Sequence, residues 1–161
     1  MSVEIKKYTY VLTTLIALLA CETESDPTPD PSFVYFLVGE IDPVRNESYI
    51  LALKDPDDIA EAREIIASSD DEKLVLAKIT KSKSDNFYLN KDLTTGEKWS
   101  WHISSFEGFV DFTIEIYDGW PSYVEENYEE WVDNTKGSNG KGIIGFWNYT
   151  LKREVDKSEL Y

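Results

Sequence analysis

Apolar and polar residues alternate most regularly between residues 99 and 131. Within this stretch, residues 109–117 alternate with period two, which is typical of an antiparallel strand with one buried and one solvated face. Its apolar positions are Val110, Phe112, Ile114 and Ile116. Before it, Trp99, Trp101 and Ile103 share one face of a shorter extended segment. The pattern therefore predicts two extended segments, each with one apolar face.

Two helices are predicted from apolar residues at helical spacing and from the residues that start each helix. The first follows Asp55, which can cap the N-terminus, and Pro56, which suits a first turn. The second follows the turn Asp118-Gly119 and begins at Pro121. Their apolar faces are Ile59, Ala62 and Ile66 in the first helix and Val124, Tyr128 and Trp131 in the second.

Apolar runs rich in β-forming residues complete the predicted fold. They predict strands at residues 33–41, 49–53, 74–79 and 143–155, and a short strand or ordered loop at residues 87–89. We therefore expect one α+β domain over residues 33–156, followed by a tail of residues 157–161. Its antiparallel sheet would hold about five or six strands in the order β-β-α-β-β-β-α-β, with both helices packed on it.

Residues 1–20 have the pattern of a cleaved leader and not of a folded segment. Lys6 and Lys7 precede the apolar run of residues 11–20, which is too short to cross a bilayer as a helix. The run leads into the sequence LLAC, ending at Cys21, which resembles a bacterial lipobox. We therefore expect residues 1–20 to be a lipoprotein signal peptide and Cys21 to carry the lipid. The alternative is an ordinary secretory signal with a chance cysteine.

Residues 21–32 are acidic and rich in proline, which is typical of a solvated, semi-extended tether. At about 3 Å per residue this tether would hold the domain roughly 30 Å from the lipid. Glu22 stands where the best-known signal for retention in the inner membrane has aspartate. We therefore expect a lipid-anchored protein of the bacterial cell envelope, in the outer membrane, on its periplasmic or its surface face.

The formal net charge of −15 narrows the classes of partner. A surface of this sign repels phosphate backbones, so we expect no nucleic acid partner. It also disfavours electrostatic contact with anionic lipid. High solubility is the simplest interpretation, while cations and basic partners remain open. Three lysines interrupt the acidic surface, Lys78, Lys81 and Lys83, and they predict a solvated sheet edge near residues 74–79.

Metal and cofactor sites have little support in the sequence. One cysteine and one histidine allow neither an intrachain disulfide nor a zinc site of the usual kind. The acidic residues Asp55, Asp57 and Asp58 suggest calcium, but they lack the glycine and the distal glutamate of an EF-hand loop. Helix capping explains them, and we expect no metal and no cofactor.

His102 is the one residue that suggests catalysis, as a general base oriented by a carboxylate. The candidate carboxylates are Glu107, Asp111 and Asp118. No serine elbow, phosphate loop or second histidine accompanies it, and a packed histidine bonded to the backbone is the competing interpretation. Similarly, three tryptophans suggest an aromatic platform for a sugar, peptide or cation, with core packing as the alternative. They are Trp99, Trp101 and Trp120.

Four short motifs resemble one domain family, whose members often carry W-S-W-H, I-E-V-C-D-G, P-S-Y-V-E and D-P-x-x-I-x-x-A-R. They correspond to residues 99–102, 114–119, 121–125 and 55–63. The chain thus resembles the N-terminal domain family named after the calmodulin-binding protein BP-seventy-four, over about residues 33–155. The family has two cysteines that look like a disulfide pair, and Tyr117 and Trp147 stand in their places here. The resemblance implies no catalytic residues, and the calmodulin link belongs to the named member.

These observations lead to three hypotheses. The first is a lipid-anchored, non-enzymatic binding or interaction module of the cell envelope, with a protein, peptide or glycan ligand. Its contact surface would comprise Trp99, Trp101, His102, Asp118, Gly119 and Tyr123. The second is a hydrolase that uses His102 with a nearby carboxylate. The third is a purely structural protein of the envelope.

Overall fold

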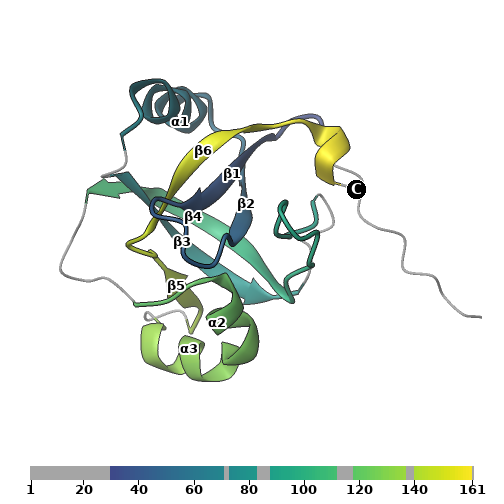
Figure 1. Cartoon of the computed structure of the whole chain (residues 1–161), viewed down its shortest axis with the longest axis vertical. Helices are drawn as coiled ribbons and strands as arrows, with labels where there is room; N and C mark the ends of the chain where they lie inside the picture. The colour runs from purple at the N-terminus through teal and green to yellow at the C-terminus, as the bar shows by residue number, and fades with distance from the viewer. Residues whose placement is uncertain (1–29, 71–72, 83–87, 112–117, 137–139, 161) are drawn as a thin grey trace, which may run out of the picture.

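The computed structural model describes residues 30–70, 73–82, 88–111, 118–136 and 140–160 of the chain (Figure 1). The described elements are, in order, β1 (Val34–Glu40), β2 (Ser48–Leu53), α1 (Pro56–Ser68), β3 (Lys73–Lys81), β4 (Trp101–Asp111), α2 (Pro121–Glu126), α3 (Tyr128–Thr135), β5 (Gly142–Ile144), β6 (Tyr149–Val155) and the 3-10 helix η1 (Lys157–Leu160). The predicted class, a single α+β domain, is confirmed.

The described strands form two antiparallel sheets, with the strand orders β2-β1-β6 and β4-β3-β5. The predicted single sheet is divided because the last apolar run, residues 143–155, is not one strand. It turns at residues 145–148, where the Tyr149 N–H donates to the Phe146 carbonyl at 3.1 Å. Before this turn β5 pairs with β3, and after it β6 pairs with β1, so the chain passes from one sheet to the other.

β4 begins earlier than predicted, because Trp101 and Ile103 belong to the same strand as residues 109–111. It pairs with β3 from Lys73 opposite Asp111 to Lys81 opposite Trp101. Residues 112–117 of the predicted strand lie outside the described residues, as does residue 87 of the predicted segment 87–89.

α1 follows its sequence signals. The Asp55 side chain accepts a hydrogen bond from the Asp57 N–H at 2.9 Å, and Pro56 occupies the first turn, so the predicted cap is confirmed. Ala62 and Ile65 are the buried centre of its apolar face, with other apolar side chains partly buried at the margins. The helix ends at Ser69, which adopts a left-handed conformation with φ 54°.

The second predicted helix is divided at Asn127 into α2 and α3. The Asn127 side-chain amide and its backbone N–H both donate to the Tyr123 carbonyl, at 3.0 Å each. An asparagine that bonds to the preceding turn in this way competes with regular helix hydrogen bonding. Even so, the predicted docking face is confirmed, because Val124 and Trp131 are buried and Tyr128 is partly buried against the core.

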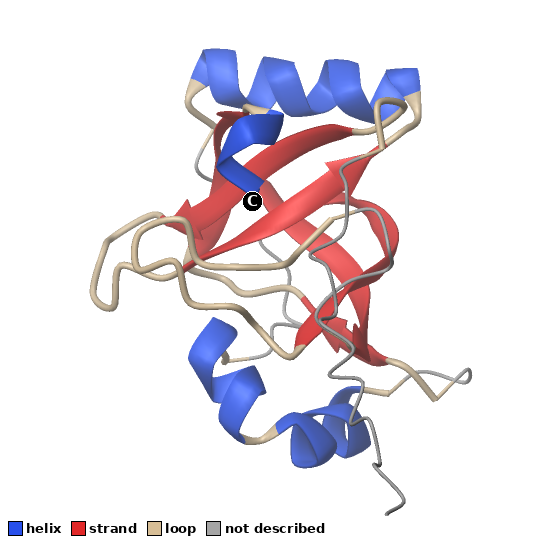
Figure 2. Ribbon diagram, turned by 90° about the vertical axis from the view of Figure 1, so that its right-hand side faces the viewer, coloured by secondary structure: helices blue, strands red, loops and turns tan. Residues whose placement is uncertain are grey.

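One hydrophobic cluster joins residues of both sheets and of the helices. Aromatic rings run through it in consecutive contact, from Trp99 through Trp101, Tyr49, Phe146, Trp131 and Tyr123 to Trp120. Figure 2 shows α1 at one end of the strands and α2 and α3 at the opposite end. The aromatic residues between positions 99 and 131 therefore serve mainly to pack the two sheets against each other and against α3.

The sheet edge predicted from the lysines is wrong at Lys78. Lys78 and Lys81 lie on β3, the middle strand of its sheet, and Lys78 has strand partners on both β4 and β5, whereas Lys81 lies beyond Ile79, the last β3 residue paired with β5. Both lysines form ion pairs, Lys78 with Glu107 at 2.7 Å and Lys81 with Glu129 at 2.8 Å. Lys83 lies outside the described residues.

The predicted C-terminal tail belongs to the packed domain as far as residue 160. η1 places Leu160, which is buried, in a second cluster with Tyr35, Ile50, Tyr88 and Val155. Arg153 binds Glu159 through a two-pronged ion pair, with N–O distances of 2.8 and 2.7 Å. Within the described ranges, no helix has the length and apolar character needed to cross a membrane.

Candidate functional site

Two residues of the predicted contact surface are buried core residues. Trp99 is 1% exposed, and its Nε1 donates to the Ser48 carbonyl at 2.9 Å. Trp101 is completely buried, stacks on Trp99 with ring centroids 6.4 Å apart and packs against Tyr49. A predicted platform built on these two indoles is therefore wrong, because neither ring presents a face to solvent.

His102 is also buried, and its ring contacts explain it structurally. Nδ1 lies 2.7 Å from the Ser82 carbonyl, and the ring meets Tyr88 edge to face. Two of the carboxylates expected to orient it have other partners, since Glu107 binds Lys78 and Asp111 binds Lys73. Among the described residues, no hydrogen bond or ion pair joins His102 to a carboxylate. The hydrolase hypothesis therefore lacks its base–carboxylate pair.

The signature motifs are bound to one another. The Glu125 carboxylate, in the P-S-Y-V-E motif, accepts hydrogen bonds from the Ser100 N–H at 2.7 Å and its hydroxyl at 3.0 Å, in the W-S-W-H motif. Ser122 donates through its N–H and its hydroxyl to Glu47, at 3.1 and 2.6 Å. Since Trp120 makes no side-chain cap to α2, Glu47 satisfies the helix start from a distant loop.

Close packing requires a glycine at position 119. A Cβ at this position would lie 2.5 Å from Trp131 Cζ3 and 3.1 Å from Phe146 Cε1. Carbon atoms in contact normally lie about 3.5–4.0 Å apart, so no larger residue fits without movement. Tyr123, another predicted contact residue, packs between Trp120 and Trp131. The Asp118-Gly119 turn thus brings the chain against α3.

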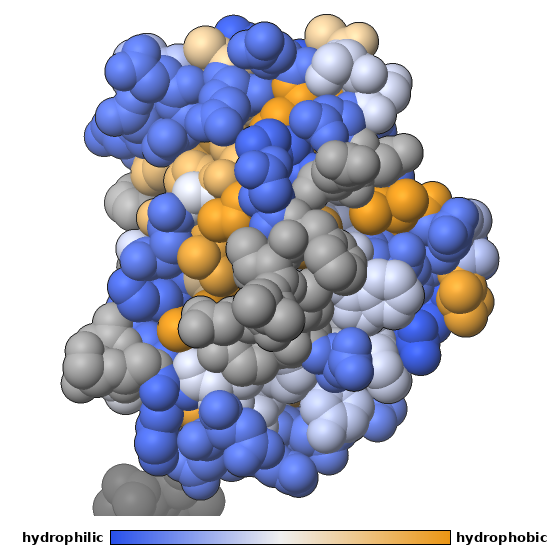
Figure 3. Space-filling view, turned by 90° about the vertical axis from the view of Figure 1, so that its left-hand side faces the viewer, coloured by the Kyte–Doolittle hydropathy of each residue, from blue (hydrophilic) through white to orange (hydrophobic). Residues whose placement is uncertain are grey.

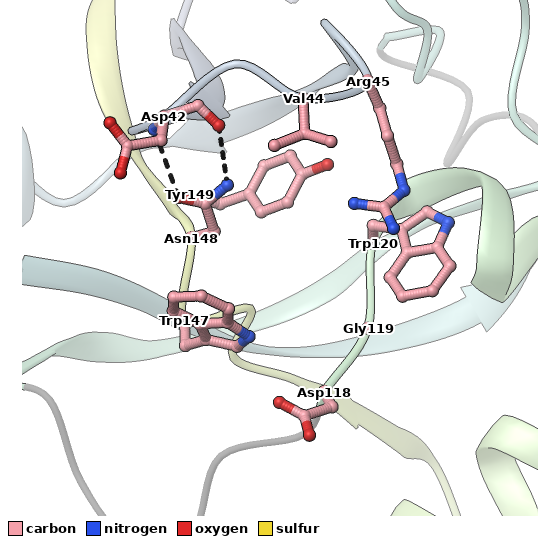
Figure 4. A pocket seen from close by; sticks show the side chains of 9 residues that line it. All are labelled: Asp42, Val44, Arg45, Asp118, Gly119, Trp120, Trp147, Asn148 and Tyr149. Atoms are coloured by element: carbon pink, nitrogen blue, oxygen red, sulfur yellow. Dashed lines mark hydrogen bonds between the residues drawn. The ribbon is translucent and has the colours of Figure 1, made fainter.

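A pocket of about 480 Å³ lies beside this turn (Figure 4). It is built from the β1–β2 loop, the residues before α2, and the turn between β5 and β6. We call it the tryptophan pocket, and its lining residues are Asp42, Val44, Arg45, Asp118, Gly119, Trp120, Trp147, Asn148 and Tyr149. Of the six predicted contact residues it contains two, Asp118 and Gly119.

The β1–β2 loop that forms one wall is held by a buried carboxylate. Glu40, which is 7% exposed, accepts hydrogen bonds from the backbone N–H groups of Val44, Arg45 and Asn46, at 2.6, 2.9 and 3.0 Å. The Tyr149 hydroxyl donates to the same carboxylate at 3.1 Å. Burial, followed by the charge of Glu40, raises the pKa of Tyr149 above its ordinary value. The wall is therefore preorganised by charge-assisted hydrogen bonds.

A second set of bonds ties this wall to the β5–β6 turn. The Asn148 side chain accepts from the Asp42 N–H at 3.2 Å and donates to the Asp42 carbonyl at 3.0 Å (Figure 4). The Ile41 N–H donates to the Asn148 carbonyl at 2.7 Å. Two segments more than a hundred residues apart in sequence are thus fixed side by side at the pocket rim.

The pocket combines exposed apolar surface with charges of both signs. Val44 is 73% exposed and Trp147 is 48% exposed. The Arg45 guanidinium lies over the Trp120 ring, 3.7 Å from its centroid. The carboxylates of Asp42 and Asp118 are exposed, and the described residues offer neither of them an ion pair. The pocket can therefore stack a flat or apolar group and bind a polar one beside it.

Sequence reasoning missed most of this site. Trp147 is predicted on a strand, whereas it projects from the turn that separates β5 from β6. The one available signal was that Trp147 replaces a family cysteine. Its apparent counterpart, Tyr117, lies outside the described residues, but the neighbouring Asp118 does line the same pocket. Val44 and Arg45 fall between the predicted strands 33–41 and 49–53, and no motif or pattern in the sequence singled them out.

The model of the BP-seventy-four N-terminal domain family matches residues 32–158. Neither the curated proteins nor the solved structures contain a match. The matched range includes every residue of the tryptophan pocket and all the motif residues discussed above, and it excludes Cys21 and most of the predicted tether.

Proposed function

Since the chain belongs to the BP-seventy-four N-terminal domain family, we propose that residues 32–158 act as a non-enzymatic binding module that contacts its ligand through the tryptophan pocket. One observation carries the proposal. Among the described residues, the large hydrophobic side chains that are exposed are Val44 and Trp147, and both line this pocket. Exposed apolar residues gathered at one concave site mark interaction surfaces more often than scattered ones do.

Figure 3 shows one face of the molecule, on which hydrophilic residues are the more numerous, in keeping with the net charge of −15, and hydrophobic groups lie in patches between them. A tryptophan buries about 150–250 Å² when covered, so covering the exposed part of Trp147 removes roughly 100 Å² from water. At about 25 cal/mol per Å², this contributes about 2–3 kcal/mol to binding.

The proposed anchor rests on the sequence alone. Residues 1–20 would direct export, Cys21 would carry the lipid, and residues 22–32 would connect it to the domain. The module would then act at the outer membrane of a bacterial envelope, and its pocket would meet ligands in the periplasm or outside the cell. Palmitate labelling of the full chain should be lost in Cys21→Ala, and labelling that persists would contradict the anchor.

Site-specific photo-cross-linking tests the binding module itself. A benzophenone amino acid is placed at position 147 of the full chain in cells, and at position 64 as the control. Glu64 is exposed on α1, at the opposite end of the strands from α2 and α3 (Figure 2). We expect a discrete adduct from position 147 that is absent from position 64. Identical adducts from both positions, or none from position 147, would contradict the proposal.

A purely structural role is the second candidate, because one set of observations favours it. The polar groups of the signature residues have hydrogen-bond partners within the fold: Ser100 donates to Glu125, Ser122 to Glu47 and Trp99 to Ser48. The signature therefore accounts for the family's fold and is silent about a ligand. Absence of any adduct at position 147 would leave this structural role as the better account.

A further inference from the structure

We infer that the tryptophan pocket selects an organic cation, of the alkylammonium or guanidinium kind carried by lysine and arginine side chains. The inference rests on the proposed binding module and adds the chemical class of its ligand.

The two pocket carboxylates differ from many others in the domain. Asp42 and Asp118 are exposed on the pocket lining, and the described structure shows no side-chain bond or ion pair to either carboxylate. Elsewhere in the described residues, several acidic side chains are engaged by cations or by N–H and O–H donors, among them Glu40, Glu47, Glu107, Asp111, Glu125, Glu129, Asp133, Glu154 and Glu159. Exposed acids on the helices, such as Glu64 and Glu126, also show no such partner, but they do not line this pocket. The pocket therefore offers carboxylates whose electrostatic partner can come from a ligand.

The exposed indole lies with these carboxylates. Asp42, Asp118 and Trp147 line one pocket, and Figure 4 draws the Trp147 ring between the two acids. An aromatic face attracts a cation through its quadrupole, and tryptophan does so best. A cation seated on Trp147 would thus meet an aromatic face with the Asp118 carboxylate beside it, while the Asp42 carboxylate, which Figure 4 draws turned outward from the ring, adds negative charge at the rim.

The pocket lining contains one cationic side chain, Arg45, and it already has an aromatic partner. Arg45 lies over Trp120, with its guanidinium carbon 3.7 Å from the ring centroid. It occupies the second indole and leaves Trp147 for a ligand. The pair Arg45–Trp120 also shows, within this pocket, the geometry that a guanidinium adopts on an indole.

The charge of the whole chain favours the same sign of ligand. A net charge of −15 attracts cations towards the surface and repels anions. A neutral sugar would use the same indole and the same hydrogen-bonding groups. It would, however, be indifferent to salt and to the net charge of Asp42 and Asp118, and this difference separates the two ligand classes.

Fluorine NMR on the purified full chain tests the inference. Tryptophan is replaced by 5-fluorotryptophan, the resonance of residue 147 is assigned with Trp147→Phe, and the detergent is octaethylene glycol dodecyl ether, which carries neither charge nor sugar. The probes are a short lysine peptide, the same peptide with glutamine for lysine, tetramethylammonium chloride and a neutral glucose oligosaccharide. We expect the lysine peptide to shift the residue 147 resonance and the glutamine peptide to leave it unchanged.

Matched variants complete the test. Asp42→Asn with Asp118→Asn should weaken lysine-peptide binding about tenfold, as expected for loss of a favourable charge contact beside an aromatic face. Glu64→Gln makes the same kind of change on α1 and should have no effect. Binding should also weaken as salt is raised. A shift by tetramethylammonium as well as by the lysine peptide identifies a free ammonium group as sufficient, and a shift by the peptide alone identifies a peptide ligand; both support the inference.

The contrary outcomes separate this inference from the proposed function. If the oligosaccharide shifts the residue 147 resonance and the lysine peptide does not, the binding module stands and its cationic ligand is refuted. Equal binding by the wild-type chain and the doubly amidated variant likewise refutes it. If no cationic probe moves the resonance, the inference is overturned whatever the cross-linking shows, and the binding module falls only if cross-linking at position 147 also fails.

Discussion

Replacing Gly119 by alanine tests whether the Asp118-Gly119 turn is a packing site. The added Cβ would lie 2.5 Å from Trp131 Cζ3 and closer still to Cη2 of the same ring. The indole cannot withdraw freely, because it is 5% exposed and its Nε1 donates to the Ile143 carbonyl at 3.0 Å. Overpacking of this kind costs typically about 1–3 kcal/mol, and the severe overlap places Gly119→Ala at about 2–3 kcal/mol.

The assay is urea unfolding followed by circular dichroism, with thermal melts alongside. We expect the free energy of unfolding to fall by about 2–3 kcal/mol and the melting temperature by roughly 10 °C. Gly145→Ala is the matched control, because its Cβ would meet Leu76 Cδ1 at an ordinary contact distance of 3.4 Å. It should cost less than about 1 kcal/mol.

A double-mutant cycle locates the cause. Trp131→Phe removes the ring atoms that collide with the new methyl group, so the two substitutions together should cost at least about 1 kcal/mol less than the sum of their separate effects. A Gly119→Ala variant as stable as Gly145→Ala would refute the packing argument. Strict additivity with Trp131→Phe would refute the assignment of the clash to Trp131.

Three further predictions concern hydrogen bonds and pH. Glu125→Ala removes the acceptor of the Ser100 N–H and hydroxyl and should cost about 2 kcal/mol in urea unfolding, whereas Glu126→Ala, an exposed neighbour, should be near neutral; equal effects would contradict the bond between the motifs. Glu40→Gln should speed hydrogen exchange at the amides of Val44, Arg45 and Asn46 without a comparable change in α1, and unchanged exchange at these amides would count against the carboxylate anchor. Burial raises the pKa of Tyr49 and Tyr149 in the folded state, so the stability that their neutral hydroxyls contribute is complete below their ordinary pKa near 10 and is lost as pH rises above it. Tyr149→Phe should therefore reduce the slope of the free energy of unfolding against pH above about 10. An unchanged slope would refute this.

Local signals in the sequence were sufficient for the elements that depend on neighbouring residues. Asp55 and Pro56 predicted the start of α1, and the structure shows the cap bond to Asp57. The apolar runs at residues 33–41 and 49–53 predicted two strands of an antiparallel sheet, and β1 and β2 form there and pair antiparallel. Such features are decided within a few residues of chain, so periodicity and capping chemistry predict them.

The division into two sheets could not be predicted in this way. Residues 143–155 are apolar enough to form one strand. The turn at residues 145–148 contains no proline, and Gly145 is its one glycine. What decides the turn is tertiary: Phe146 is buried in the shared core, and Asn148 is bound to Asp42. The same long-range pairing made β3 a central strand, although its lysines suggested an edge.

The position of the candidate site could not be predicted from the sequence either. Rare residues drew attention to Trp99, Trp101 and His102, and the structure buries all three. A cluster of large aromatic residues is informative about packing, since such residues contribute most to a core. The pocket instead gathers residues from three segments, 42–45, 118–120 and 147–149, and their proximity exists only in the folded chain.

The signature tryptophans are buried and the proposed contact site is exposed, and tryptophan oxidation measured by mass spectrometry tests this difference directly. In the purified full chain, brief exposure to hydroxyl radicals should modify Trp147 readily and leave Trp99 and Trp101 nearly unmodified, in keeping with exposed fractions of 48%, 1% and 0%. In intact cells, where ligand is present, modification of Trp147 should fall while the other two stay low. Rapid modification of Trp99 or Trp101 in the purified chain, or equal modification of Trp147 in both conditions, would contradict the account.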